Sequence, residues 1–265
     1  MGAARKPKPH YADLLSPSVT PADLAQGIGI ANSLKPHELI RLAHDSGLKH
    51  IVQTSGMEFD RELLLARAIA AKPKDFLNHP LEMINGSNSA KSERRFSMNS
   101  DAAESKDRLI DSFAEFLAES SSTRRVLERA ILIADELYTN GSKNAWPGNS
   151  GLFEGPATSK GTIEFFSAAD ESRLVIGCKD SFGKLSTKRL TARLLECFDK
   201  GVADSIRRGS GGAGIGSYLV FESSVSYYAG VQANKKTLVC VVLPIGARMR
   251  EISESVKHVH LFSIK

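Results

Sequence analysis

The chain has 265 residues, of which 42% are hydrophobic and 25% are charged, and its formal net charge is +5. This length suits one large core, or one core with a small second domain, and the composition is that of an ordinary globular protein. No apolar run approaches the roughly 20 residues that a membrane-crossing helix needs, and the basic start lacks the apolar stretch of a secretory signal.

Charge and cysteine content narrow the expected environment and partners. The 35 Lys and Arg residues barely outnumber the 30 Asp and Glu residues, and no basic helix is interleaved with aromatic residues, so we expect no nucleic-acid partner. Cys178, Cys197 and Cys240 are far apart and form no Cys-x-x-Cys pair. We therefore expect reduced thiols in a cytoplasmic protein, without a zinc site and without membrane association.

The N-terminal part of the chain divides into a tail and a small folded region. Residues 1–20 are basic and contain several prolines without periodicity, which predicts a flexible tail. Residues 21–82 contain three short helical patterns and are predicted to be mainly helical, with a role that no motif indicates. Thr20 is expected to cap the first helix, Pro36 to begin the second, and Asp60 to cap the third.

The remaining boundaries follow from composition. Residues 50–54 could form a short strand within the N-terminal region. Residues 83–93 are polar and rich in Gly, Ser and Asn, which is typical of a linker. Residues 247–265 form a C-terminal extension, in which 256–264 could be an additional strand. The main domain is therefore expected at 94–246.

The main domain mixes strand and helix patterns. The expected elements are a strand at 94–100, helices at 101–119 and from 124, strands at 162–167 and 173–179, a helix at 187–199, a helix after 216, and strands at 224–229 and 237–243. The last strand is apolar on both faces and is expected to lie centrally. The predicted fold class is α+β: a two-layer α/β sandwich with a mixed, mostly antiparallel sheet and helices on one face.

The first chemical motif lies at the end of the helix expected from residue 124. Glu136, Asn140 and Lys143 are spaced by four and three residues, which places them on one stripe of that helix. A carboxylate, a carboxamide and an ammonium on one stripe can serve as a base, a metal ligand and a phosphate contact. The same side chains could equally form a solvated helix surface, which this stretch taken alone slightly favours.

Two further motifs follow in a fixed order. Asp180 ends an apolar strand, and Gly212, Gly214 and Gly216 lead straight into an apolar helical pattern. Glycines at a helix start leave backbone N–H groups free to bind an anion such as a polyphosphate. The glycine run is not a P-loop, because Ser217 stands where that motif requires lysine. Taken alone, each feature could also be an ordinary turn.

The three motifs in this order resemble the nucleotide-binding domain of the GHKL superfamily. That superfamily includes gyrase-type ATPases, MutL, heat-shock chaperone ATPases, histidine kinases and bacterial anti-sigma serine kinases. The resemblance covers residues 94–246, and the order of elements is closest to the anti-sigma factor serine kinase branch. It implies the Bergerat-type ATP-binding fold, with ATP and Mg²⁺ as ligands.

The resemblance also implies roles for individual residues. Asp180 would accept a hydrogen bond from the adenine amino group, and Thr237 matches a hydroxyl often found near the adenine. Asn140 would bind Mg²⁺ through its side-chain oxygen. Glu136 would act as general base, and Lys143 would contact phosphate.

Several positions depart from the family pattern or allow another interpretation. The family usually has Asp-x-Gly-x-Gly, whereas Phe182 and Lys184 occupy the two glycine positions here, so Gly183 would supply the turn instead. Asn144 stands where an aromatic residue or a histidine often packs near the nucleotide. Thr237 could also be an ordinary β-branched strand residue.

These features predict a cytoplasmic regulatory protein of the anti-sigma factor or serine/threonine-protein kinase kind, which uses Mg·ATP to phosphorylate or sequester a partner protein. The expected partner is a sigma factor, an anti-anti-sigma-like protein or another signalling protein, and the protein could form a homodimer. One alternative is an atypical histidine kinase whose phosphoacceptor is His37 in the N-terminal region. The other is a non-catalytic, nucleotide-gated binding module.

Overall fold

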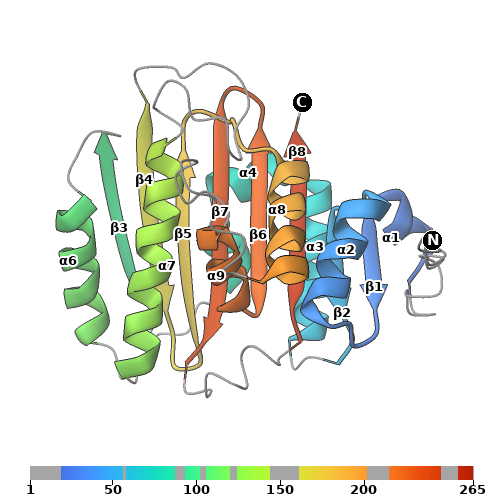
Figure 1. The fold of residues 1–265 in the computed structure, drawn as a ribbon, viewed down its shortest axis with the longest axis horizontal. Helices are drawn as coiled ribbons and strands as arrows, with labels where there is room; N and C mark the ends of the chain where they lie inside the picture. The colour runs from blue at the N-terminus through green and yellow to red at the C-terminus, as the bar shows by residue number, and fades with distance from the viewer. Residues whose placement is uncertain are drawn as a thin grey trace, which may run out of the picture.

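The computed structural model describes residues 19–55, 58–86, 93–101, 106–119, 124–143, 161–201, 215–245 and 256–264. The strands of these residues are β1 (Ile28–Ala31), β2 (His50–Gln53), β3 (Arg94–Asp101), β4 (Thr162–Ala169), β5 (Arg173–Asp180), β6 (Ser226–Gln232), β7 (Lys236–Pro244) and β8 (His258–Ile264). They form one sheet in the order β1-β2-β8-β6-β7-β5-β4-β3 (Figure 1). β1 is parallel to β2 and β6 is parallel to β8, while the other pairings are antiparallel. The expected mixed, mostly antiparallel sheet is confirmed.

Helices cover both faces of this sheet. The helices of the described residues are α1 (Pro21–Ala25), α2 (Pro36–Ser46), α3 (Phe59–Ala71), α4 (Pro73–Asn78), α5 (Pro80–Asn85), α6 (Lys106–Ala118), α7 (Arg124–Lys143), α8 (Thr187–Lys200) and α9 (Ile215–Glu222). α2 and α6 to α9 pack on one face, together with Phe165 and Tyr227, and α3 to α5 pack on the other, together with Phe166 and Tyr228 (Figure 1). The helices of residues 94–246 thus share one face as expected, but α3 to α5 add a third layer that the two-layer description lacks.

The two ends of the chain belong to the same sheet as the main domain. β8 lies between β6 and β2, so it joins the N-terminal strands to the rest, and β7 lies centrally as expected. β1, α4 and α5 were not expected, and α5 includes the first residues of the predicted linker 83–93. The N-terminal region therefore shares a core with the main domain. No helix in the described parts of the chain is both long and apolar enough to cross a bilayer.

Two of the three predicted helix starts are confirmed. The Thr20 side chain accepts a hydrogen bond from the backbone N–H of Asp23 (3.1 Å), and Pro36 is the first residue of α2. The predicted cap at Asp60 is wrong. α3 begins at Phe59, two residues earlier than a cap at Asp60 would require, so Asp60 lies within the first turn, where a carboxylate still interacts favourably with the helix dipole.

The long helix α7 is placed by its apolar stripe. The buried residues of this stripe recur at helical spacing and include Val126, Ala130, Ile133, Ala134 and Leu137. Each fully buried Leu or Ile side chain contributes roughly 1.5–3 kcal/mol. A Cβ atom on Gly141 would lie 3.1 Å from the Sγ atom of Cys178, so glycine allows the last turn of α7 to approach β5 closely. Asn140 is thereby brought to the end of β5 that carries Asp180.

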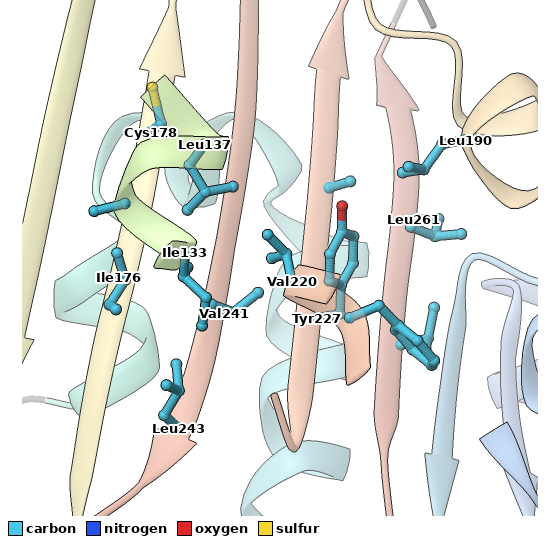
Figure 2. Packing of buried hydrophobic residues seen from close by; sticks show 14 of the residues in the cluster. Ile133, Leu137, Ile176, Cys178, Leu190, Val220, Tyr227, Val241, Leu243 and Leu261 are labelled. Atoms are coloured by element: carbon cyan, nitrogen blue, oxygen red, sulfur yellow. The ribbon is translucent and has the colours of Figure 1, made fainter. Parts of the chain in front are cut away.

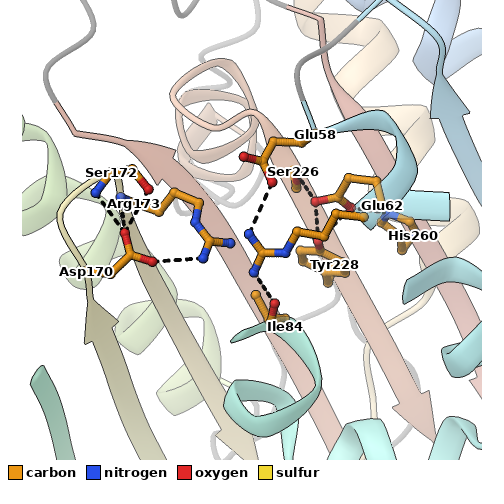
Figure 3. Close-up of polar contacts among 10 residues, drawn as sticks. Glu58, Glu62, Ile84, Asp170, Ser172, Arg173, Ser226, Tyr228 and His260 are labelled. Carbon is orange, nitrogen blue, oxygen red and sulfur yellow. Dashed lines mark hydrogen bonds and ion pairs between the residues drawn. The ribbon is translucent and has the colours of Figure 1, made fainter. Parts of the chain in front are cut away.

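A buried polar cluster fastens α3 to the sheet. Glu62 of α3 accepts hydrogen bonds from the hydroxyls of Ser226 (2.8 Å) and Tyr228 (2.8 Å), and it lies 3.1 Å from Nε2 of His260 (Figure 3). Nδ1 of His260 is in turn 3.1 Å from Nδ1 of His50. Burial by itself would raise the pKa of Glu62, but the hydrogen bond and charge of His260 and the Tyr228 hydroxyl hold it at about 2.

Candidate functional site

A small cavity of about 30 Å³, partly open to solvent, lies between α7, the start of α9 and strands β5, β6 and β7. Its apolar walls include Leu137, Leu185, Leu190, Val220 and Val239. Its polar groups come from Asn140, Asp180, Ser217, Tyr227 and Thr237. Figure 2 shows side chains from α7, β5, α9 and β6 meeting in this part of the core. Apolar walls with a few polar groups are typical of small-molecule sites.

Asp180 lies at the end of β5 with its carboxylate at the cavity. The residue is 5% exposed, and its Oδ1 atom accepts hydrogen bonds from the backbone N–H groups of Phe182 (2.9 Å) and Gly183 (3.2 Å). These two bonds fix the orientation of the carboxylate relative to the turn. An ionised carboxylate has acceptors only, so this wall of the cavity selects a hydrogen-bond donor on any ligand.

The turn after Asp180 depends on Gly183, as the sequence predicted. Gly183 has φ +62°, and a Cβ atom there would overlap the carbonyl oxygen of Gln232. Phe182 and Lys184 flank it in the sequence. Phe182 is buried, and the Nζ atom of Lys184 donates to Oδ1 of Asn234 (2.7 Å). The tight turn is therefore centred on Gly183.

Thr237 supplies a hydroxyl that has no partner among the described residues. It lies directly opposite Asp180 in the β5–β7 pairing and is 3% exposed. Its Oγ1 atom is buried and makes no hydrogen bond within the described residues. Leaving a buried hydroxyl unpaired costs about 1–3 kcal/mol. A ligand group in the cavity would satisfy this hydroxyl.

Three further polar side chains line the cavity, those of Asn140, Ser217 and Tyr227. Burial raises the pKa of the Tyr227 hydroxyl, so this group stays protonated at neutral pH. Burial likewise raises the pKa of the Cys178 thiol, which also lines the cavity and is held in its neutral form.

Glu136 lies next to the cavity, at the start of α9. A Cβ atom on Gly216 would overlap the Glu136 carboxylate, so only glycine permits this close approach. Gly216 is the second residue of α9 and is buried. The contact places a carboxylate of α7 beside the first backbone N–H groups of another helix. The structure thus brings the first and third sequence motifs together.

The remaining predicted site residues lie outside the described part of the chain. These are the side chain of Lys143, which ends α7, together with Asn144, Gly212 and Gly214. Their roles stay predictions. Among the described residues, no group of three or more His, Cys, Asp or Glu side chains could hold a metal ion.

Sequence reasoning missed three side chains of the cavity: Cys178, Ser217 and Tyr227. Cys178 and Asp180 are two residues apart on one strand, so their shared face could have been inferred from the period of a strand. Ser217 follows Gly216 directly and could have been included with the glycine run. Tyr227 carries no local signal, because its place depends on how β6 enters the sheet.

No protein-family model matches the chain, and the search of curated proteins found no match either.

Proposed function

We propose that this cavity binds ATP together with Mg²⁺, and that the protein is an ATP-dependent regulator of the serine/threonine-protein kinase kind. The observation that carries the proposal is the convergence of Asn140, Asp180 and Thr237 on one cavity. These residues come from three separate elements. The buried, unpartnered hydroxyl of Thr237 shows that the described residues alone leave the cavity incompletely paired.

The end of the cavity at Asp180 suits an aminopurine base. The carboxylate accepts from an exocyclic amino group, and the Thr237 hydroxyl can donate to a neighbouring ring nitrogen. The apolar walls at Leu137 and Val220 suit the faces of a flat ring. A site built to pair with a donor discriminates strongly against a ligand that lacks it, because its own buried groups are then left unpaired.

The end of the cavity at α9 suits the phosphates. The first backbone N–H groups of a helix attract an anion, and at Gly216 the Glu136 carboxylate lies beside them and would move aside for a phosphate. The Asn140 side-chain oxygen is suited to hold Mg²⁺, an ion that takes few protein ligands and completes its shell with phosphate and water. Glu136, beside the start of α9, is placed to accept a proton from an attacking hydroxyl or water. Such positioning is most of what phosphoryl transfer requires.

The partner is proposed to be a protein, such as a sigma factor, an anti-anti-sigma-like protein or another signalling protein. The histidine kinase alternative is less well supported. His37 lies at the start of the short helix α2, half-buried, with its ring centre 6.4 Å from that of Phe198 on α8. A phosphoacceptor must reach the nucleotide of a kinase domain, and a ring packed between two helices is poorly placed for that.

Binding of nucleotide is tested by calorimetric titration of the full chain with Mg·ATP and Mg·GTP. We expect ATP to bind, Asp180→Asn to weaken it at least tenfold, and Asp111→Asn, a control on the exposed side of α6, to leave it unchanged. If the wild-type protein does not bind ATP, or if both variants bind equally, the proposed site is wrong.

Transfer is tested with labelled ATP and protein from the native host. Acid-stable label on a partner that is lost in Glu136→Gln supports serine or threonine phosphorylation. Acid-labile label on the chain itself supports the histidine kinase. ATP binding with no label, and unchanged output in Glu136→Gln, supports the non-catalytic module.

A further inference from the structure

Helix α9 is held at its C-terminal end by a lysine from the C-terminal segment. The Nζ atom of Lys257 donates hydrogen bonds to the carbonyl oxygens of Ser224 (2.7 Å), Glu222 (3.0 Å) and Phe221 (3.4 Å). Lys257 is 1% exposed, and its ammonium also lies 5.4 Å from the centre of the Phe221 ring. The Lys257 side chain thus contacts the C-terminal end of α9 and the residues that directly follow it.

The carbonyl groups at the end of a helix lack intrahelical partners and carry a partial negative charge. A cation in contact with them stabilises the helix and fixes its direction. Burial lowers the pKa of Lys257 to about 8, an effect that the nearby Glu222 opposes. The ammonium is therefore still largely charged at neutral pH.

The opposite end of the same helix lies at the cavity. Gly216 contacts the Glu136 carboxylate, and Ser217 lines the cavity wall. α9 has eight residues and is therefore about 12 Å long. A helix this short moves as one unit, so whatever fixes its C-terminal end also fixes the direction of its first N–H groups.

Lys257 is itself held by an element outside the main domain. Its carbonyl oxygen accepts a hydrogen bond from Nε2 of Gln53 (2.7 Å), at the end of β2. The backbone N–H of Gln53 donates to Nδ1 of the next residue, His258 (3.2 Å). The N-terminal region and the C-terminal segment thus set the position of Lys257 together.

We propose that Lys257 is a positioning residue for the phosphate-binding end of α9, so that the C-terminal segment takes part in nucleotide binding. This inference rests on the proposed function. It assigns a role to a segment outside residues 94–246, and it separates two parts of the ligand. Lys257 affects the phosphates through α9, whereas the base is held by Asp180 and Thr237.

The test compares the affinities of full-length variants for Mg·ATP and for adenosine, which has no phosphate. We expect Lys257→Met to weaken ATP binding roughly five- to tenfold, the scale of a cation at a helix terminus, and to leave adenosine binding unchanged. Lys257→Arg, which keeps the charge, should retain most of the ATP affinity. Lys74→Met, on the exposed side of α4, is the matched control and should behave as wild type.

A merely structural role for Lys257 gives a different pattern. Equal losses for ATP and adenosine, or no loss in a folded Lys257→Met protein, overturn the inference while leaving ATP binding by the wild type intact. If Lys257→Met does not fold, Lys257→Gln keeps hydrogen-bond donors without the charge and must show the same selective loss for ATP. A wild-type protein that binds neither ligand overturns the proposed function and this inference with it.

Discussion

Asp180 and Thr237 face each other across the pairing of β5 and β7, and both side chains reach the same cavity. The carboxylate is oriented by two backbone N–H groups, whereas the hydroxyl has no partner among the described residues. The Asp180 carboxylate is therefore held by the protein backbone, whereas the Thr237 hydroxyl can pair with a ligand. This difference leads to the first prediction.

Thr237→Val should leave the protein as stable as wild type or make it up to ~1 kcal/mol more stable, because it removes an unpaired buried hydroxyl. The same variant should weaken ATP binding about tenfold. Thr191→Val is the matched control. The Thr191 hydroxyl is paired with the Thr187 carbonyl (3.1 Å) and with Nδ1 of His44 (2.8 Å). It should lose ~1–2 kcal/mol in urea unfolding and keep ATP affinity. A clear loss of stability in Thr237→Val would contradict the assignment.

Gly216→Ala should destabilise the protein by about 1 kcal/mol, because the added methyl group overlaps the Glu136 carboxylate, which is the far end of a flexible side chain and can move aside. The cause can be isolated with a double-mutant cycle. In a Glu136→Ala background the same substitution should cost much less, since the overlapping group is gone. Thermal unfolding of the four proteins measures the coupling. Additive effects would show that Glu136 and Gly216 are not in contact.

Gly183→Ala should be among the most destabilising glycine substitutions, at about 3 kcal/mol or more. It places a side chain at φ +62°, and the new Cβ would also overlap the Gln232 carbonyl. Gly47→Ala tests the two causes separately. Gly47 has φ +73° and ψ 8°, in the left-handed region, with open space around it, so only the backbone cost of about 1–2 kcal/mol applies. Similar losses in both variants would argue against the steric term.

Stability should fall as the pH is lowered below about 6.5. Burial lowers the pKa of His50 to about 2 and that of His258 to about 4, and the pKa of Glu62 is held at about 2. In each case the unfolded chain takes up its proton first, so acid favours unfolding. Protonation of the two histidines lowers the free energy of unfolding between about pH 6.5 and their folded pKa values, and protonation of Glu62 lowers it below about pH 4.5. Urea midpoints measured from pH 7 to pH 4 check the sign.

His258→Asn isolates one of these groups. The side-chain oxygen of the new asparagine can still accept the hydrogen bond that Nδ1 of His258 receives from the Gln53 backbone N–H. The asparagine side chain does not titrate. The slope of stability against pH between 6.5 and 4 should therefore be shallower than in wild type. An unchanged slope would show that His258 does not contribute to acid sensitivity.

Local patterns were sufficient for much of the fold. The apolar stripe of α7, the hairpin of β4 and β5 and the amphipathic helix α8 follow from side-chain spacing within one segment. The turn at Gly183 was also predicted, because Phe182 and Lys184 on either side of it leave Gly183 as the glycine of that turn. The account of residues 21–82 was incomplete: α1, α2, α3 and β2 were expected, but β1, α4 and α5 were not, because these elements are short and have no distinctive period.

The sequence by itself determined the helices and hairpin of the main domain, and it identified Glu136, Asn140, Asp180 and Gly216 as candidates, because spacing along a helix or strand is a local property. Only the tertiary structure decided that Thr237 lies opposite Asp180, that Glu62 meets His260, and that Lys257 holds the end of α9. Each of these contacts joins segments far apart in the chain. They form only when the sheet assembles, and their energy comes from burial and hydrogen bonding between elements that no local pattern relates.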